Sequence, residues 1–449
     1  MKISKYTFWF DINEKEFYAY NSLSNALIEL DAESYRLLQG HDEGAEISDS
    51  NLDNELWTAL CQNNILTECD DDDYLKYKAS IIRLRSQRTS MHLTLAPTMD
   101  CCFRCHYCFE KYKEKKYMTP EIMDAIAKYV TSYPELKNIK ITWFGGEPLM
   151  ALPQIEEFHE KFSSLWKKPF NSNIITTGYH IDDEAIRVMK KVGITSAQIT
   201  LDGMKETHNK VKHIPSGEDV FEKVVSNIEL LNNLAPEINI IIRVNLTHEN
   251  AHEYRDVCKL FFDRFNERKN MGITPAFVLD RGASNCNICD VQNQLFKHKD
   301  RSDFILNLAM HGIDSAFLRY PEPFFYECAI RNDMAISFDP EGYAYKCWEV
   351  IGNKEYAIGK LNHDGLLTDI NEKVLNRQLF GADPLEDSTC SQCEYLPLCN
   401  GGCPIQRIEN KFEGGHNCNC THYKGYMAEF LKIHIARRKA QEALESKES

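Results

Sequence analysis

Three cysteines, Cys101, Cys105 and Cys108, have the spacing C-x3-C-x2-C and are the residues of this chain best suited to chemistry. Three thiolates on one short loop can hold three irons of a [4Fe–4S] cluster and leave the fourth iron open, whereas ferredoxins supply four cysteines for electron transfer. An open iron can bind a small molecule. Zinc is the alternative, because it takes closely spaced cysteines but requires four ligands, for which Cys102 is adjacent. The spacing favours the open iron–sulfur site.

The composition limits the classes of function. With 449 residues the chain is long enough for two or three domains. Its 52 basic and 67 acidic side chains give a net charge of −15, which argues against non-specific binding to nucleic acid or anionic membranes. It has 17 cysteines, no secretion signal and no apolar run long enough to span a bilayer. We therefore expect a cytoplasmic metalloprotein with reduced thiols.

The cysteine loop needs a scaffold, and an alternation of apolar strands with amphipathic helices predicts one. The predicted strands are residues 91–97, 139–146, 173–178, 197–203, 238–246 and 274–280. Six strands fall short of the eight of a full barrel, so we expect an α/β fold built on a partial (β/α)6 TIM barrel. The cysteine loop follows the first strand, at the carboxyl edge where such sheets carry their active sites.

The remaining segments differ in pattern from this barrel. Residues 1–88 read as a hairpin and short helices, a winged-helix-like unit in which residues 65–74 leave as a strand and Asp70 to Asp73 begin a linker. Regular periodicity fades and cysteines become frequent near the carboxyl end. The predicted regions are 1–88, a barrel over 89–280, a bridge over 281–315, a cysteine-rich domain over 316–425, and a terminal helix over 426–449.

With these motifs in place, residues 91 to about 425 resemble radical S-adenosylmethionine (SAM) enzymes. The run DCCFRCHYCF resembles the loop C-N-x-x-C-x-Y-C of that family, with Cys102 in place of Asn. The resemblance implies that SAM chelates the open iron and yields a 5′-deoxyadenosyl radical. Tyr107 or Phe109 would cover the adenine, although an aromatic residue at this position also fits ordinary packing.

Further segments resemble SAM-binding motifs of the family. Gly145, Gly146 and Glu147 match its GGE motif, which implies that Glu147 receives the SAM amino group. Lys212 stands where the family often has Arg. Each of the other segments also fits simple turn or strand chemistry. The remaining SAM contacts implied by the resemblance are Thr177, Thr200, Asp202 and Arg243.

The cysteines near the carboxyl end resemble the SPASM extension of this family, which carries two auxiliary [4Fe–4S] clusters. The outer cluster would be held by Cys390, Cys393, Cys399 and Cys420, and the inner one by Cys328, Cys347 and Cys403. No cysteine stands a few residues before Cys328, so the fourth inner position is either open to a substrate thiolate or filled by Cys418, Cys286 or Cys289. The alternative is a pair of zinc knuckles.

The resemblance implies three [4Fe–4S] clusters, SAM, an external flavodoxin- or ferredoxin-like electron donor and a precursor peptide with a leader. SPASM enzymes act largely on peptides, and the amino-terminal unit resembles elements that bind leader peptides by strand addition. We expect a maturase of ribosomally made peptides (a RiPP maturase) that forms thioethers. The alternatives are an anaerobic sulfatase-maturating enzyme, a C–C cross-linking or epimerising maturase, and a non-catalytic leader-binding or electron-transfer protein.

Overall fold

A computed structural model of the chain describes residues 1–41, 45–49, 52–110, 113–214, 216–265, 270–279, 295–324 and 327–448. Cys286 and Cys289, considered as ligands above, lie outside the described residues. No helix within the described ranges is long and apolar enough to cross a membrane.

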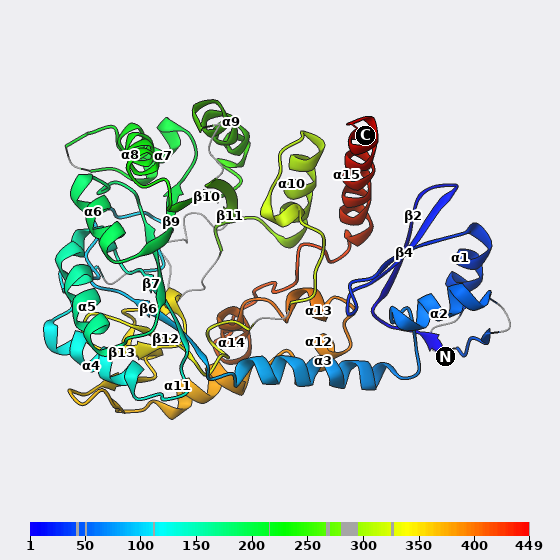
Figure 1. The fold of residues 1–449 in the computed structure, drawn as a ribbon, viewed down its shortest axis with the longest axis horizontal. Helices are drawn as coiled ribbons and strands as arrows, with labels where there is room; N and C mark the ends of the chain where they lie inside the picture. Colours follow the sequence, from blue (N-terminus) through cyan, green and yellow to red (C-terminus); the bar gives the residue numbers. More distant parts are fainter. Residues whose placement is uncertain are drawn as a thin grey trace.

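Six parallel strands form the main sheet and pair in the order in which they occur along the chain. They are β6 (Ser90–Leu95), β7 (Asn138–Trp143), β8 (Phe170–Thr176), β9 (Ile194–Leu201), β10 (Asn239–Leu246) and β11 (Met271–Phe277). The helices between them line the outside of the sheet in Figure 1. These are α4 (Pro120–Thr131), α5 (Leu152–Leu165), α6 (Asp183–Lys191), α7 (Lys205–Val211), α8 (Val220–Leu234) and α9 (Tyr254–Phe265). All six predicted strands and the α/β class are confirmed.

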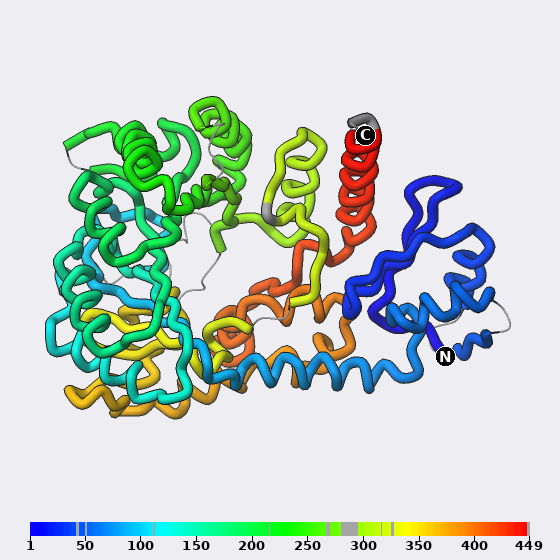
Figure 2. Tube along the Cα trace, viewed as in Figure 1, coloured from blue at the N-terminus to red at the C-terminus, as the bar shows by residue number. Residues whose placement is uncertain are grey.

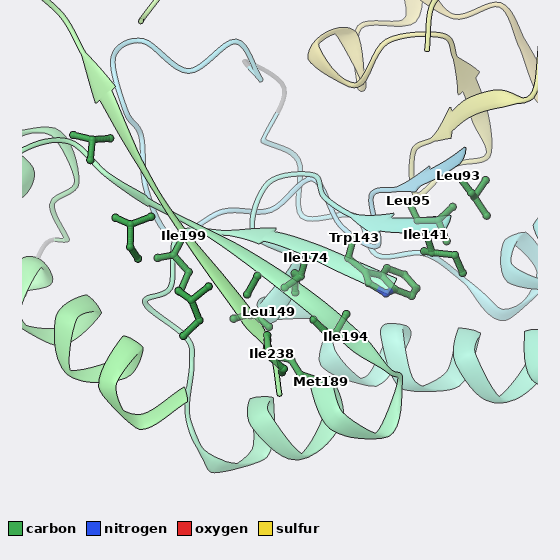
Figure 3. Packing of buried hydrophobic residues seen from close by; sticks show 14 of the residues in the cluster. Leu93, Leu95, Ile141, Trp143, Leu149, Ile174, Met189, Ile194, Ile199 and Ile238 are labelled. Carbon is green, nitrogen blue, oxygen red and sulfur yellow. The ribbon is translucent and has the colours of Figure 1, made fainter. Parts of the chain in front are cut away.

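The core lies between these strands and helices because apolar residues repeat at every second position of each strand. In β7, Ile139, Ile141 and Trp143 are buried while Asn138 and Lys140 are exposed. The Trp143 ring packs edge-on against Phe158 of α5, with ring centroids 5.5 Å apart. Figure 3 shows Trp143 in this layer between the strands and the helices. Burial of each large side chain contributes about 1.5–3 kcal/mol, which fixes the strand ends that carry the candidate site.

The sheet continues into the cysteine-rich region, which the periodicity does not predict. Strand β12 (Ala335–Phe338) pairs in parallel with β6, on the side away from β7. Three short antiparallel strands extend the sheet to ten: β13 (Tyr343–Tyr345), β14 (Gly359–Leu361) and β15 (Leu367–Thr368). Cys347 therefore lies just after a strand of the same sheet that carries the C-x3-C-x2-C loop.

The amino-terminal unit contains the predicted hairpin, β2 (Thr7–Asn13) and β3 (Glu16–Asn21), and a third strand, β4 (Leu27–Leu30). Asp31 caps α1 (Ala32–Gln39) by accepting from two backbone N–H groups. Helix α2 (Asn54–Gln62) follows, and β1 (Lys2–Ile3) pairs with β5 (Leu66–Thr67). The winged-helix-like assignment stays a prediction.

The prediction of a strand and a linker over residues 65–74 is wrong beyond Thr67. Asp70 begins a helix, α3 (Asp70–Arg85), and the four aspartates from Asp70 to Asp73 form its first turn. Negative charge at a helix amino terminus is favourable because it interacts with the helix dipole. The acidic run therefore starts a helix of 16 residues.

Helix α3 connects the amino-terminal unit to the cysteine-rich region. Figures 1 and 2 show it extending along that region. The Tyr74 hydroxyl donates to the Leu385 carbonyl, and Tyr77 donates to that of Leu396. The cysteine-rich region and the carboxyl end contain α10 (His298–Met310), α11 (Glu372–Asn376), α12 (Ser388–Ser391), α13 (Leu396–Cys399), α14 (Pro404–Phe412) and α15 (Met427–Glu448).

Replacing Arg85 tests this connection. Its guanidinium pairs with Glu327 at 2.6 Å and forms two bonds to Asp383, and the two acidic side chains are only 1% and 8% exposed. We expect Arg85→Met to cost about 3–5 kcal/mol, because it leaves buried carboxylates without this partner. The control is Lys78→Met on the same helix: its partner Glu386 is 67% exposed, so the loss should be below about 1 kcal/mol. Equal losses of thermal stability in the two variants would contradict this.

Candidate active site

A cavity of about 360 Å³ opens at the carboxyl ends of the parallel strands. Nine of the predicted site residues line it: Cys101, Cys105, Tyr107, Cys108, Gly145, Gly146, Thr177, Thr200 and Arg243. Glu147 and Asp202 are buried and are not among the lining residues. A larger cavity of about 720 Å³ lies beside α9 and β11, but Cys258 is the only cysteine on its walls. The chemistry-bearing residues therefore place the candidate active site in the smaller cavity.

The cysteine loop is held against the turn that follows β7. The Glu147 N–H donates to the Asp100 carbonyl at 2.8 Å, and the Gly146 N–H donates to that of Thr98 at 3.2 Å. A Cβ atom on Gly146 would lie 2.2 Å from the Asp100 oxygen. Glycine at this position therefore allows the backbones to touch, and the turn positions Cys101, the next residue along the loop.

Burial and one cation set the charge of the thiols. A hydrogen bond with Cys102 lowers the pKa of Cys101 to about 7, whereas burial raises the pKa of Cys108 to about 12. The Lys113 ammonium donates to the Phe103 carbonyl at 2.9 Å and lies near all three thiols. Burial acts to lower the pKa of Lys113, but the neighbouring thiols and Glu110 raise it. Lys113, which no motif predicts, is therefore a permanent positive charge beside this loop.

The Glu147 carboxylate connects the ends of two strands. Its Oε1 accepts from the Leu149 N–H at 3.0 Å and from the Thr176 hydroxyl at 2.6 Å. Its Oε2 accepts from the Thr177 N–H at 2.8 Å and from the Thr177 hydroxyl at 2.6 Å. A carboxylate has about four acceptor positions, and these four bonds occupy them. The contact of Glu147 with a SAM amino group stays a prediction.

A buried ion pair between Lys212 and Asp202 contacts Tyr107 of the cysteine loop. The Lys212 ammonium and the Tyr107 hydroxyl both donate to Asp202, and Lys212 and Asp202 are 2% and 1% exposed. The Asn245 amide donates to the Tyr107 oxygen at 2.9 Å. Lys212 lies at the cavity wall, but in this arrangement it is paired with Asp202. The pair attaches the cysteine loop, through Tyr107, to the ends of β9 and β10.

Comparison with known proteins agrees with this geometry. Residues 95–261 match the radical SAM superfamily. These residues form a radical SAM domain. It is 25% identical to a cysteine-type anaerobic sulfatase-maturating enzyme of Clostridium novyi, over 75% of this chain and 94% of that protein. It is 21% identical to the radical SAM cyclopropyl synthase TigE of Paramaledivibacter caminithermalis, over 91% and 90% of the two chains.

Two solved structures share the fold. Native anSMEcpe with bound AdoMet and Cp18Cys peptide superposes with a TM-score of 0.56 at 21% identity, over 78% of this chain and 97% of that chain. SuiB of Streptococcus suis bound to S-adenosylmethionine superposes with a TM-score of 0.51 at 14% identity, over 93% and 99%.

The donor set of the cavity fits the cofactors of a radical SAM enzyme. Among the described residues, no three His, Cys, Asp or Glu side chains converge as the ligands of a single metal ion must. A cluster spreads its thiolates over different irons, so Cys101, Cys105 and Cys108 around one cavity suit it. The two glycines leave the backbone of the turn after β7 open to a ligand. When bound, the cluster and SAM supply hydrogen-atom abstraction, and this chain's residues hold and orient them.

The structure gathers the cysteines of the carboxyl-terminal region in two places. Burial is the largest cause that raises the pKa of Cys347. Nearby groups, Cys403 and Cys328 among them, raise it further. Burial raises the pKa of Cys399 to about 11, and the neighbouring Cys393 and Cys390 add to this shift. These neighbourhoods match the inner and outer groupings implied by the resemblance. The ligand sets themselves stay predictions.

Cys418 and Cys420 lie side by side but face different groups. The Lys424 ammonium lies 3.8 Å from the Cys420 sulfur. The hydrogen bond with Cys420 lowers the pKa of Cys418 to about 5, and the charges of His298 and Arg301 on α10 act in the same direction. Cys418 thus faces α10. This arrangement favours Cys420 as the outer ligand.

The cavity also contains two aromatic residues for which no motif predicts a role, Phe144 and Trp348. Phe109 stacks with Phe144 at 6.2 Å between ring centroids, and Phe144 lies 6.1 Å from Trp348. Trp348 follows Cys347 directly, so this aromatic row joins the cysteine loop to the inner cysteine group. Its three members lie far apart in the sequence, and only the tertiary fold brings them together.

Replacing Gly146 tests the contact between turn and loop. We expect Gly146→Ala to displace Asp100 and the adjoining Cys101, because the added Cβ would overlap the Asp100 oxygen. Iron bound per chain should fall, and SAM binding should weaken by about tenfold or more, the loss of at least one charge-assisted contact. Gly272→Ala is the control, since a Cβ there meets no atom within 4 Å. Normal iron content and SAM affinity in Gly146→Ala would contradict this.

Acid should destabilise the fold through His208. Burial and the Lys212 charge lower its pKa to about 3, so the folded protein keeps this ring neutral. The unfolded chain binds the proton below about pH 6.5, and stability then falls by about 1.4 kcal/mol per pH unit. His208→Gln should reduce the difference in denaturant midpoint between pH 7.5 and pH 5.5. An unchanged difference would show that other groups cause the acid sensitivity.

Proposed function

We propose that the chain modifies a ribosomally made precursor peptide and closes thioether bonds from its cysteine sulfurs to carbon. The observation that carries the proposal is the composition of the cavity wall. The same cavity is lined by the C-x3-C-x2-C loop and by Trp348 and Glu349, which follow Cys347 of the inner cysteine group. The radical and the second thiolate site would then act on the same substrate in this cavity.

The inner group supports thioether formation because it offers three cysteines. Cys328, Cys347 and Cys403 would hold three irons of an auxiliary [4Fe–4S] cluster, and the sequence has no cysteine from 290 to 327 to hold the fourth. Of the remaining candidates, Cys418 is engaged with Cys420, and Cys286 and Cys289 lie outside the described residues. A substrate thiolate would fit the open position. With the outer group and the C-x3-C-x2-C loop, the proposed total is three clusters.

The atoms and electrons of this reaction balance with one electron acceptor. The peptide loses one hydrogen atom from carbon in the abstraction step. As the carbon–sulfur bond closes, the thiol loses its proton and one electron leaves the substrate. The inner cysteine group, a SPASM site by resemblance, would hold the acceptor next to the new bond. An external flavodoxin- or ferredoxin-like donor would complete the cycle, and we propose that the enzyme acts in the cytoplasm.

The amino-terminal unit supports a peptide substrate with a leader. Its sheet has two edge strands, β2 and β4, and β2 lies near α15. Lys439 of α15 also pairs with Glu16, the first residue of β3, at 2.7 Å. An extended leader segment adding to β4 would extend the sheet, as in other strand-addition complexes. Residues 1–88 would then be a winged-helix-like recognition domain, tied by α3 to the cysteine-rich region.

The alternative is a sulfatase-maturating enzyme, because the Clostridium novyi relative carries that name. The sulfatase-maturating relative covers 75% of this chain, whereas the cyclopropyl synthase covers 91%. A maturase that forms C–C bonds or epimers is a further alternative. The longer coverage favours a RiPP maturase.

The test uses the reduced holoenzyme, SAM and a cysteine-containing peptide encoded beside the gene. We expect each bond formed to remove two hydrogen atoms from the peptide, measured by mass spectrometry, and to protect one thiol from alkylation. Retained thiols would indicate C–C bonds, and an aldehyde that reacts with a hydrazide would indicate formylglycine. Cys101→Ala should produce no 5′-deoxyadenosine. Equal yields of 5′-deoxyadenosine from Cys101→Ala and from the wild-type protein would contradict the proposal.

A further inference from the structure

The amino-terminal unit packs on the stretch of chain that carries three of the four proposed outer ligands. We call this stretch, residues 390–399, the outer segment. The Lys5 ammonium donates to the Ser391 carbonyl at 3.3 Å. The Ser22 hydroxyl donates to the Glu394 carbonyl at 2.6 Å. Figure 1 shows α12 and α13, which overlap the outer segment, beside the amino-terminal unit. The unit therefore binds the backbone of the segment directly.

Apolar contacts accompany these hydrogen bonds. The Phe8 ring of β2 packs against the Tyr395 ring, with the ring centroids 4.8 Å apart, and Tyr395 is buried. Leu396 belongs to an apolar cluster with side chains of α3, and Leu23 and Cys390 pack against the same cluster. One of the proposed outer ligands thus shares an apolar contact region with the amino-terminal unit.

The shape of the outer segment depends on how its cysteines are held. All of its residues are described, and they contain no strand, while α12 and α13 have four residues each. Helices of this length are not stable alone. Ser391 directly follows Cys390, and Glu394 directly follows Cys393, so each accepting carbonyl lies one residue from a proposed ligand. A bound cluster would fix the distance between the two cysteines, and hence the positions of both carbonyls.

We propose that the outer cysteine group positions the amino-terminal unit, so that the cluster held there is needed to present the precursor peptide to the cavity. The inference rests on the proposed outer cluster and on the proposed recognition role of residues 1–88. The unit binds the leader whether or not it is docked on the outer segment. Only the docked unit holds the rest of the peptide at a fixed distance from the cysteine loop. Undocking therefore lowers the effective concentration of the reacting residues at the cavity.

The first experiment measures amide hydrogen exchange in the reconstituted full-length chain, without peptide. It compares Cys393→Ala with Cys101→Ala, each of which removes one proposed cluster ligand and should lower iron per chain. We expect exchange over residues 5–10 and 18–24 to become about fivefold faster or more in Cys393→Ala, because undocking exposes these strands. Cys101→Ala is the matched control and should leave exchange there unchanged. Exchange over β9 is the reference for unfolding of the whole chain.

Two results would overturn the proposal. They are unchanged exchange in the amino-terminal unit of Cys393→Ala after its iron is lost, and equal acceleration in Cys393→Ala and Cys101→Ala. If Cys393→Ala keeps its iron, the proposed ligand set is wrong, and the second experiment decides whether the outer segment positions the unit.

The second experiment removes the contact from the other side and keeps every cysteine. Phe8→Ala deletes the ring that packs on Tyr395, and Phe8→Tyr keeps a ring there. We expect Phe8→Ala to retain its iron, its SAM affinity and its peptide-independent 5′-deoxyadenosine formation. Its Kd for the leader peptide should change less than about twofold, while the rate of modification of bound peptide falls about tenfold. Phe8→Tyr should restore that rate.

The split between leader affinity and rate distinguishes positioning from damage to the unit. A loss of leader affinity that accounts for the whole loss of rate would overturn the proposal, and so would an unchanged rate in Phe8→Ala. If the wild-type chain modifies no peptide, the proposed maturase function fails, and the hydrogen-exchange comparison alone decides whether the outer cysteine group positions the amino-terminal unit.

Discussion

The active site depends on a contact between two pieces of backbone. The turn after β7 and the loop after β6 touch through the Glu147 N–H and the Asp100 carbonyl, and only a residue without a Cβ fits at Gly146. Because the same Glu147 also binds Thr176 and Thr177, the ends of β6, β7 and β8 form one connected unit. A loop that holds three thiols in position needs such a rigid base, since its own backbone has few internal hydrogen bonds.

The sequence predicts those features whose signal is local. Apolar residues at alternate positions predict β6 to β11, and cysteine spacing predicts the loop. Strands β12 to β15 have two to four residues each, too few for a period to be visible. They are fixed by pairing, β12 with β6 and each later strand with the one before it. The acidic run at Asp70 has the composition of a linker, yet favours the start of a helix. Two of the groups that hydrogen-bond to the Glu147 carboxylate, Thr176 and Thr177, are about 30 residues away in the sequence, so no local pattern predicts these bonds.

Helix α3 connects the amino-terminal unit to the inner cysteine group. It leaves the amino-terminal unit and ends at Arg85, whose partner Glu327 precedes Cys328 of the inner cysteine group. Glu327 also accepts from the Cys328 N–H at 2.9 Å. A shift of α3 along its axis would therefore move the residue next to a proposed cluster ligand. The proposed recognition unit and the proposed second thiolate site are thus mechanically joined by one buried ion pair.

The charges around the cavity explain why its carboxylates have separate roles. Asp202 forms an ion pair with Lys212, whereas Glu147 accepts four hydrogen bonds from uncharged donors, so each carboxylate has partners within the protein. Lys113 lies beside three thiols that become thiolates when they hold iron. Burial raises the pKa of Glu110 to about 8 while the Lys113 charge opposes that shift, so this carboxyl adds little negative charge beside the cysteine loop at neutral pH.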